Sequence, residues 1–290
     1  MRRIRKIFYT TLTTFIILTV YTLSNIETNV LRTNLELENI TNIKTNKVYL
    51  LNKDNYLTEI DIFLEKDTPT NQAINIINYL KESNKKVISK YKGYIPSNTK
   101  VIDINIDNNI IYLNLSKEFL SSDINITVPG LVKSLIGING IEKVDIKINN
   151  NYLDYYDRPL DKKISINKEY IINNRSDIDR VVIYYLSDDN NYIPVTKYLN
   201  DKREKIEIII DELKNNENNN LISYLSNNVK LVDYKEENNI LFLTFNSDFL
   251  KDENIIEYNM NEIAYSIFDN YDVSSVMFIV NKENIKIINK

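Results

Sequence analysis

The sequence predicts an α+β protein with two tandem β-α-β-β-α-β domains behind an N-terminal transmembrane helix. Two observations carry this prediction. First, the segment NNIIYLNLSKEFL at residues 108–120 recurs 130 positions later as NNILFLTFNSDFL at residues 238–250. A repeat of this kind indicates a duplicated structural unit. Second, residues 7–26 form an apolar run without a single charge, and about twenty such residues can cross a bilayer as a helix.

Composition limits the chemistry that this chain can perform. Its 290 residues allow about two domains. The chain has no Cys and no His, which excludes disulfides and thiolate metal sites and removes the usual near-neutral base. Once the four cations of the first six residues are set aside, 32 basic side chains remain against 40 acidic ones. We therefore expect no cofactor and no nucleic-acid partner, because phosphate affinity comes mostly from Lys and Arg.

Residues 1–26 are predicted to be a short cytoplasmic stub followed by an uncleaved signal anchor. Arg2, Arg3, Arg5 and Lys6 precede the apolar run, and cations in this place hold the N-terminus in the cytoplasm. A cleaved signal peptide is the alternative, but no small-x-small cleavage site follows the run; a buried soluble helix is the third reading. Without Cys, a lipoprotein anchor is not expected. Residues 27–46 would be a spacer, and the body would lie outside the cell membrane.

Each repeat can be divided into the same succession of elements. The first repeat covers residues 47–149 and the second residues 180–290, with residues 150–179 as a connector too apolar for a free linker. The opening strands are expected at residues 47–51 and 180–186, each followed by Asp/Asn-rich turn residues. A helix is expected at residues 69–82, and its apolar face has the helical spacing of Ala73, Ile76, Ile77 and Leu80, matched in the second repeat by Ile206, Ile209, Ile210 and Leu213.

A hairpin and a second helix complete the repeat. The hairpin strands are expected at residues 99–106 and 110–115, and at residues 229–234 and 240–245. Strict alternation of Ile102, Ile104 and Ile106 with Val101, Asp103 and Asn105 predicts a half-buried strand. The second helices are expected near residues 128–138 and 254–269, and the closing strands at residues 143–148 and 275–280. This order usually gives one sheet with helices on one face.

Three sequence elements resemble the GerM-domain family, the sporulation and spore germination domain. The first is IPSNT, which supplies Ile95, Pro96 and Thr99; the second is LNLSKEF, which supplies Leu115, Ser116 and Phe119. The third is the strand at residues 144–148. In the second repeat the proline has no counterpart, and the Leu-Ser step becomes Phe245-Asn246.

The resemblance implies a non-enzymatic, extracytoplasmic protein of endospore-forming bacteria. Its fold would be similar to the ring-building motifs of secretion-system proteins. Its expected partners are other sporulation membrane proteins, at the channel between mother cell and forespore, or further copies of itself.

The duplicated segment offers structural residues rather than reactive ones. Ser116 next to Lys117 suggests a Ser-Lys nucleophile, but adjacent side chains point in different directions, and a dyad needs hydrogen-bond reach. Asn246 stands where Ser116 does and cannot be a nucleophile, whereas both residue types are preferred helix N-caps. Phe119 and Phe249 are predicted to fill the core. We therefore expect no catalytic residue in this segment.

Other polar clusters are better explained by ordinary structure. Asp103 and Asp107, and likewise Asp233 and Glu237, lie four residues apart on the hairpins, where two carboxylates could serve a glycosidase, but alternating acids usually form a solvated face. The run from Asp188 to Asn191 lacks the glycine and distal glutamate of a calcium loop, and no glycine pattern forms a phosphate cradle.

These observations favour a scaffold that acts by protein–protein association. The alternative is a module that binds peptidoglycan through stacking tyrosines such as Tyr155 and Tyr156, with a carboxylate hydrolase third. No metal site is expected.

Overall fold

A computed structural model describes residues 45–64, 67–87, 89–153, 158–171, 179–216, 218 and 220–290. The chain divides into two units, residues 1–45 and 46–290, and the described residues belong almost entirely to the second. The predicted signal anchor and nearly all of the predicted spacer lie outside the described residues. Within the described residues, no helix is long and apolar enough to cross a membrane.

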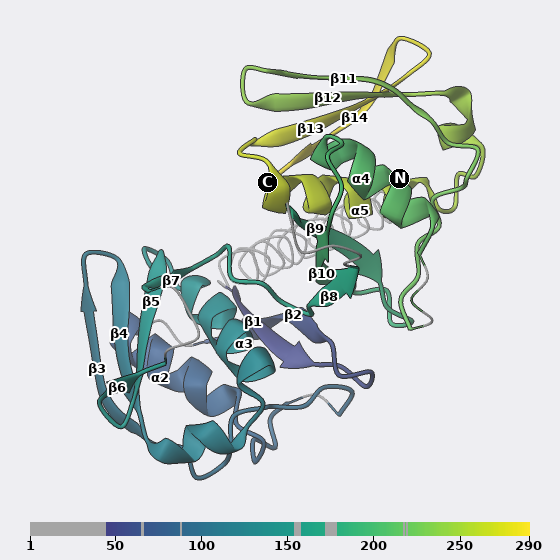
Figure 1. The fold of residues 1–290 in the computed structure, drawn as a ribbon. Coiled ribbons are helices and arrows are strands. Elements are labelled where there is room, and N and C mark those ends of the chain that lie inside the picture. Colours follow the sequence, from purple (N-terminus) through teal and green to yellow (C-terminus); the bar gives the residue numbers. More distant parts are fainter. Residues whose placement is uncertain are drawn as a thin grey trace, which may run out of the picture. The chain divides into compact units, whose positions relative to one another are not determined.

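The first repeat contains two separate sheets (Figure 1). Strands β1 (Thr45–Leu51) and β2 (Leu57–Phe63) form a two-stranded sheet. Strand β4 lies between β3, to which it is antiparallel, and β5, to which it is parallel. The remaining elements are α2 (Pro69–Tyr79), β3 (Val101–Asp107), β4 (Ile110–Leu115), η1 (Lys117–Ser121), α3 (Ile124–Ile136), β5 (Lys143–Ile148), and the short strands β6 (Asn151–Tyr152) and β7 (Leu160–Asp161), both paired with β5.

The second repeat has the same organisation. Strands β9 (Asp179–Leu186) and β10 (Tyr192–Leu199) form the opening hairpin, and β8 (Glu169–Ile171) joins β10 in parallel. The second sheet has the order β11-β12-β13-β14, and α4 and α5 lie along it (Figure 1). Its elements are α4 (Lys205–Lys214), β11 (Leu231–Glu237), β12 (Ile240–Phe245), η2 (Ser247–Leu250), α5 (Ile256–Asn270), β13 (Ser275–Val280) and β14 (Glu283–Asn289).

The α+β class is confirmed, but the predicted element order is incomplete. Each repeat has a second strand before its first helix, β2 or β10, and the opening strand pairs with this strand instead of joining the main sheet. The Asp/Asn-rich turn residues after β1 do not terminate an isolated strand. They close a tight hairpin instead, because Asn55 adopts a left-handed conformation (φ 64°) and Asn52 Oδ1 accepts the backbone N–H groups of Asp54 and Tyr56.

The apolar faces expected for the first helices are buried. Ala73, Ile76, Ile77 and Leu80 are fully shielded from solvent, and their counterparts in α4 are almost as well buried. Each repeat has its own core, the first centred on β4, β5, α2 and α3 and the second on β12, β13, α4 and α5. Ile164 and Ile166 of the connector belong to the first core.

The paired asparagines that open the duplicated segment form the hairpin turns. Asn108 and Asn109 have φ values of 49° and 63°, and Asn238 and Asn239 have values of 52° and 63°. Positive φ at both central residues defines a type I′ turn, whose twist matches that of the flanking strands, and Asn tolerates this conformation better than most residues. The Asn-Asn pair is therefore retained for turn geometry.

Candidate interaction site

A β-bulge interrupts the first strand of the hairpin at the same place in both repeats. The register shifts between Val101 and Asp103 in β3, and between Leu231 and Asp233 in β11. The residue inside each bulge is turned outward, so that Ile102 is 48 % exposed and Val232 is 65 % exposed. The prediction that Ile102 shares a buried face with Ile104 and Ile106 is therefore wrong, because a bulge adds one residue and reverses the alternation.

Strands β3 and β11 lie at the edges of their sheets. Each pairs with only one neighbouring strand within the described chain. An edge strand presents unpaired backbone N–H and C=O groups, to which another chain can add. Each repeat thus places an exposed β-branched side chain on an open sheet edge.

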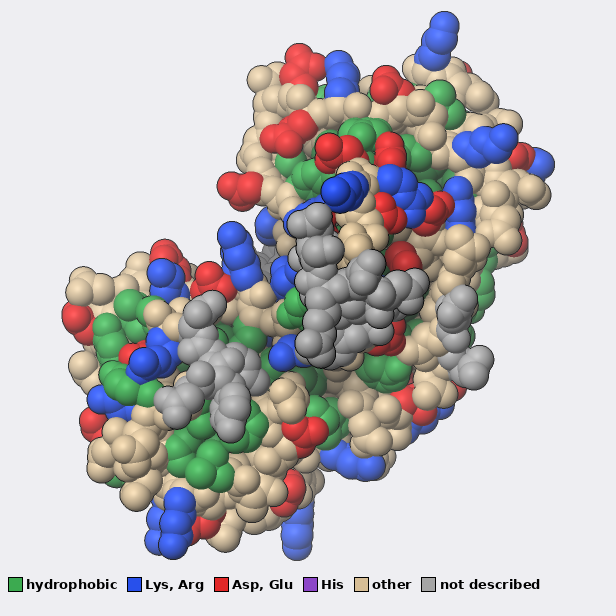
Figure 2. All heavy atoms as spheres, in the orientation of Figure 1, with side chains coloured by type: hydrophobic (Ala, Val, Ile, Leu, Met, Phe, Trp, Pro, Cys, Tyr) green, Lys and Arg blue, Asp and Glu red, His purple; other side chains and the backbone are tan. Residues whose placement is uncertain are grey.

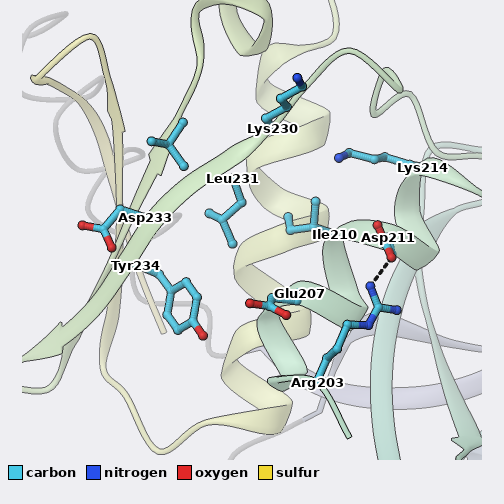
Figure 3. Close-up of a pocket in the computed structure, with 10 residues that line it drawn as sticks. Arg203, Glu207, Ile210, Asp211, Lys214, Lys230, Leu231, Asp233 and Tyr234 are labelled. Atoms are coloured by element: carbon cyan, nitrogen blue, oxygen red, sulfur yellow. Dashed lines mark hydrogen bonds and ion pairs between the residues drawn. The ribbon is translucent and has the colours of Figure 1, made fainter. Parts of the chain in front are cut away.

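In the second repeat this edge borders a groove of about 430 Å³ between α4 and β11. Figure 3 shows Ile210 of α4 and Leu231 of β11 projecting toward one another inside the groove, with Tyr234 and Glu207 at one end. In the first repeat, α2 packs against β3.

Two lysines stand at the other end of the groove. Lys214, at the end of α4, and Lys230, just before β11, both line it (Figure 3), and neither ammonium forms an ion pair with a described residue. Burial lowers the pKa of Lys214; the nearby charge of Lys230 acts in the same direction, whereas Asp211 opposes it. The carboxylates that interact electrostatically with Lys214 and Lys230 are Asp211 and Asp248. Asp211 is paired with Arg203 and Asp248 with Lys251, so neither lysine has an ion-pair partner among the described residues.

Ser116 and Asn246 precede the 3₁₀ turns η1 and η2, but neither side chain caps its turn. Ser116 Oγ accepts the backbone N–H of Lys100 at 2.9 Å, and Asn246 Oδ1 accepts that of Lys230 at 2.9 Å. The prediction is thus right that these residues stand just before a helical turn, and wrong that their side chains accept N–H groups of that turn. Each side chain ties the end of the central strand to the residue before the edge strand.

The remaining residues of the family motif lie in or next to the cores. Phe119 is fully buried and Phe249 is 2 % exposed, where it stacks on Phe245 with ring centroids 4.4 Å apart. Ile95 and Leu115 are fully buried, Pro96 is buried, and Thr99 is 1 % exposed. Ile95, Leu115 and Phe119 belong to the first core and Phe249 to the second, so their role is packing.

The other polar candidates are dispersed. Asp103, Asp107, Asp233 and Glu237 are exposed on edge strands. Asp188 pairs with Lys53, and Asp189 with Lys90. Over the described residues, no group of three or more acidic side chains could hold a metal ion. Tyr155 and Tyr156 lie outside the described residues. On the face shown in Figure 2, basic and acidic side chains are interspersed.

Two serines on the second helices have equivalent structural roles that the sequence did not predict. Ser134 Oγ donates to the carbonyl of Gly130 and accepts the backbone N–H of Tyr49 on β1. Ser266 Oγ makes the same two bonds, to Glu262 and Tyr184. These serines tie each opening strand to the second helix. Ser134 and Ser266 are 132 positions apart, whereas the duplicated segments are 130 positions apart. A separate alignment of the two second helices would therefore have paired these serines.

Comparisons with known proteins agree with the tandem arrangement. Residues 47–154 match the family described as "Germane: Sporulation and spore germination". The tandem GerMN domains of the sporulation protein GerM from Bacillus subtilis superpose with a TM-score of 0.73 at 22% identity, covering 85% of this chain and 96% of that one. No curated protein matches the sequence.

Two further solved structures match with lower scores. The first GerMN domain of the same Bacillus subtilis protein has a TM-score of 0.38 at 19% identity, covering 42% of this chain and 99% of that one. A putative lipoprotein from Clostridium perfringens has a TM-score of 0.29 at 21% identity, covering 41% of this chain and 88% of that one.

Proposed function

Because residues 47–154 match the sporulation and spore germination family, we propose that this protein is a membrane-anchored scaffold of sporulation or germination. It acts without catalysis, by protein–protein association outside the cell membrane. The sites of association are the edge strands β3 and β11. Partners are other membrane proteins at the channel between mother cell and forespore, or further copies of the chain.

The observation that carries the proposal is the bulge present in both edge strands. Burying an exposed β-branched side chain is favourable, yet both repeats leave one in solvent, Ile102 at 48 % and Val232 at 65 %. Bulges are over-represented at sheet edges and next to active sites, where they redirect a side chain or end strand pairing. A feature kept on two diverged repeats supports a shared role in contact with other proteins.

The duplicated segment supports association over catalysis. Its shared residues make turns, strand contacts and core packing, as the paired roles of Ser116 and Asn246 illustrate. A catalytic group needed in each unit should recur in both repeats. The side chains that recur at equivalent positions are structural ones.

The proposal is tested by photo-cross-linking in sporulating cells. A photoreactive residue at Ile102 or at Val232 should give adducts with membrane proteins or with a second copy of the chain. Leu120 is the matched control, because it is apolar and 49 % exposed but lies in η1, away from the sheet edges. Equal adducts at Leu120 would show that the edges have no special role. A deletion strain that sporulates and germinates like its parent would overturn the proposal.

Two further measurements address the anchor and the alternative function. Protease added to intact protoplasts should digest the body of the protein, and full protection would contradict an extracytoplasmic location. Sedimentation with purified peptidoglycan tests the alternative that the protein is a cell-wall binding module. Strong co-sedimentation that survives substitution of Ile102 and Val232 by Asp would favour that alternative over association through the edges.

A further inference from the structure

The groove between α4 and β11 combines three properties of a peptide-binding site. One wall is an edge strand with unpaired backbone groups. The floor is apolar, formed by Ile210 and Leu231 with the ring of Tyr234. Extended peptides bind in such places by adding a strand to the sheet, while alternate side chains enter pockets beside it.

The charges within the groove are unevenly distributed. Lys214 and Lys230 stand at the start of β11, whereas Glu207 lies at the opposite end, facing Tyr234 (Figure 3). Arg203, also on the wall, is held by Asp201 and Asp211. The two lysines are therefore the cations left to meet a ligand, and a carboxylate is the complementary group.

We infer that this groove binds an extended segment of a different protein, which adds to β11 as an antiparallel strand and places an acidic side chain between Lys214 and Lys230. The inference rests on the proposed function and names the partner's chemistry at one of its two edges. The segment has the pattern apolar-x-apolar-x-acidic, read from its N-terminus.

The direction and pattern follow from strand geometry. Antiparallel pairing is slightly more stable per residue than parallel pairing, and it brings the C-terminal end of the segment to Lys230, at the start of β11. Side chains two residues apart point to the same face of a strand. Two apolar side chains can therefore lie over Tyr234 and Leu231 while the acidic side chain, two residues further on, reaches the lysines.

A second copy of this chain is a poorer occupant. The edge strand β3 carries Asp103 and Asp107, and β11 carries Asp233, Glu236 and Glu237 against a single basic residue, Lys235. Like charges opposite one another destabilise a strand pair. Charge therefore favours a foreign strand over self-pairing of these edges.

The test uses a peptide with the required pattern, acetyl-Lys-Ile-Thr-Ile-Thr-Glu-amide, and the ¹⁵N-labelled fragment 45–290. This fragment contains both cores and forms one compact unit apart from the N-terminal residues. Titration should shift the amide resonances of β11 and α4. The double variant Lys214→Glu/Lys230→Glu should bind at least tenfold more weakly. A peptide ending in Lys should bind this variant better than it binds the wild type.

Lys100→Glu is the matched control, because Lys100 is the counterpart of Lys230 in the first repeat and is equally exposed. It should leave the affinity unchanged. The inference is overturned if β11 resonances do not move, if the double variant binds the acidic peptide as well as the wild type does, or if β3 responds equally. None of these results would contradict the proposed function, because cross-linking through Ile102 and the deletion phenotype test that function separately.

Discussion

Gly130 and Glu262 occupy equivalent positions in the two repeats, each four residues before the serine that holds the opening strand. A Cβ at Gly130 would lie 2.5 Å from Tyr94 Oη and 3.0 Å from Leu57. The glycine thus leaves the space that the Tyr94 ring fills. In the second repeat the glutamate side chain is buried, and Tyr224, the counterpart of Tyr94, is turned outward and 39 % exposed. The space beside the second helix is therefore filled by the loop residue Tyr94 in the first repeat and by the helix residue Glu262 in the second.

Replacing Gly130 by Ala should destabilise the protein by about 1–3 kcal/mol, the usual cost of overpacking a core. The added methyl group conflicts with Tyr94. In a Tyr94→Ala background the same substitution should cost much less, so a double-mutant cycle in urea should show a large coupling free energy. Additive costs would mean that the two residues do not compete for this space.

Glu262 should make stability fall as the pH rises. Burial raises the pKa of Glu262 from its ordinary value of 4.5 to about 8, although Ser223 donates a hydrogen bond to its carboxyl group at 3.2 Å. Between these values the folded protein retains a proton that the unfolded chain releases, so the free energy of unfolding decreases with pH across this window. Below pH 4.5 both states are protonated and the effect disappears.

Glu262→Gln should therefore flatten the pH dependence of unfolding between about pH 4.5 and pH 8, and should stabilise the protein at pH 8 by a few kcal/mol, on the order of the linkage energy. Urea unfolding at a series of pH values measures both effects. Glu257→Gln is the control, since Glu257 lies on the same helix but is exposed and paired with Lys286. A slope equal to that of the wild type would show that Glu262 titrates normally.

The sequence predicted the features that depend on local periodicity. The helical spacing of Ile76, Ile77 and Leu80 located the buried face of α2, and the strand expected at residues 110–115 coincides with β4. Strand β2 was missed although Glu59, Ile60, Asp61 and Ile62 alternate between polar and apolar side chains, as in a half-buried strand. Glu59 forms an ion pair with Lys47 of the neighbouring strand and accepts a hydrogen bond from the hydroxyl of Tyr49, contacts that exist only once the hairpin has folded.

The candidate site could be predicted from the sequence only in part. The bulges at Ile102 and Val232 leave no trace in a sequence whose alternation of apolar and polar residues continues through them. The groove depends on the spacing between α4 and β11, which is a tertiary property. The sequence predicted that Ser116 precedes a helical turn but not which N–H group its hydroxyl accepts. A serine in this place is typical of an N-cap, whereas its hydroxyl accepts the N–H of Lys100.

Thr99→Val should leave stability unchanged or raise it by up to about 1–2 kcal/mol. The Thr99 hydroxyl is buried and has no hydrogen-bond partner among the described residues, and an unsatisfied buried group costs free energy that an apolar group of the same shape does not. Val229 fills the same place in the second repeat and is 2 % exposed. The converse change, Val229→Thr, should destabilise. A loss of stability in Thr99→Val would reveal a bonded hydroxyl.

Phe119→Ala should destabilise the protein by about 3–5 kcal/mol, the range for emptying a buried aromatic site. Phe119 is fully shielded from solvent, within a core that also contains Leu115 and Ile146. Its neighbour Leu120 is 49 % exposed, so Leu120→Ala should change the free energy of unfolding by no more than about 0.5 kcal/mol. Both values follow from urea unfolding of fragment 45–290. Equal costs for the two substitutions would contradict the packing of η1, since only Phe119 faces the core.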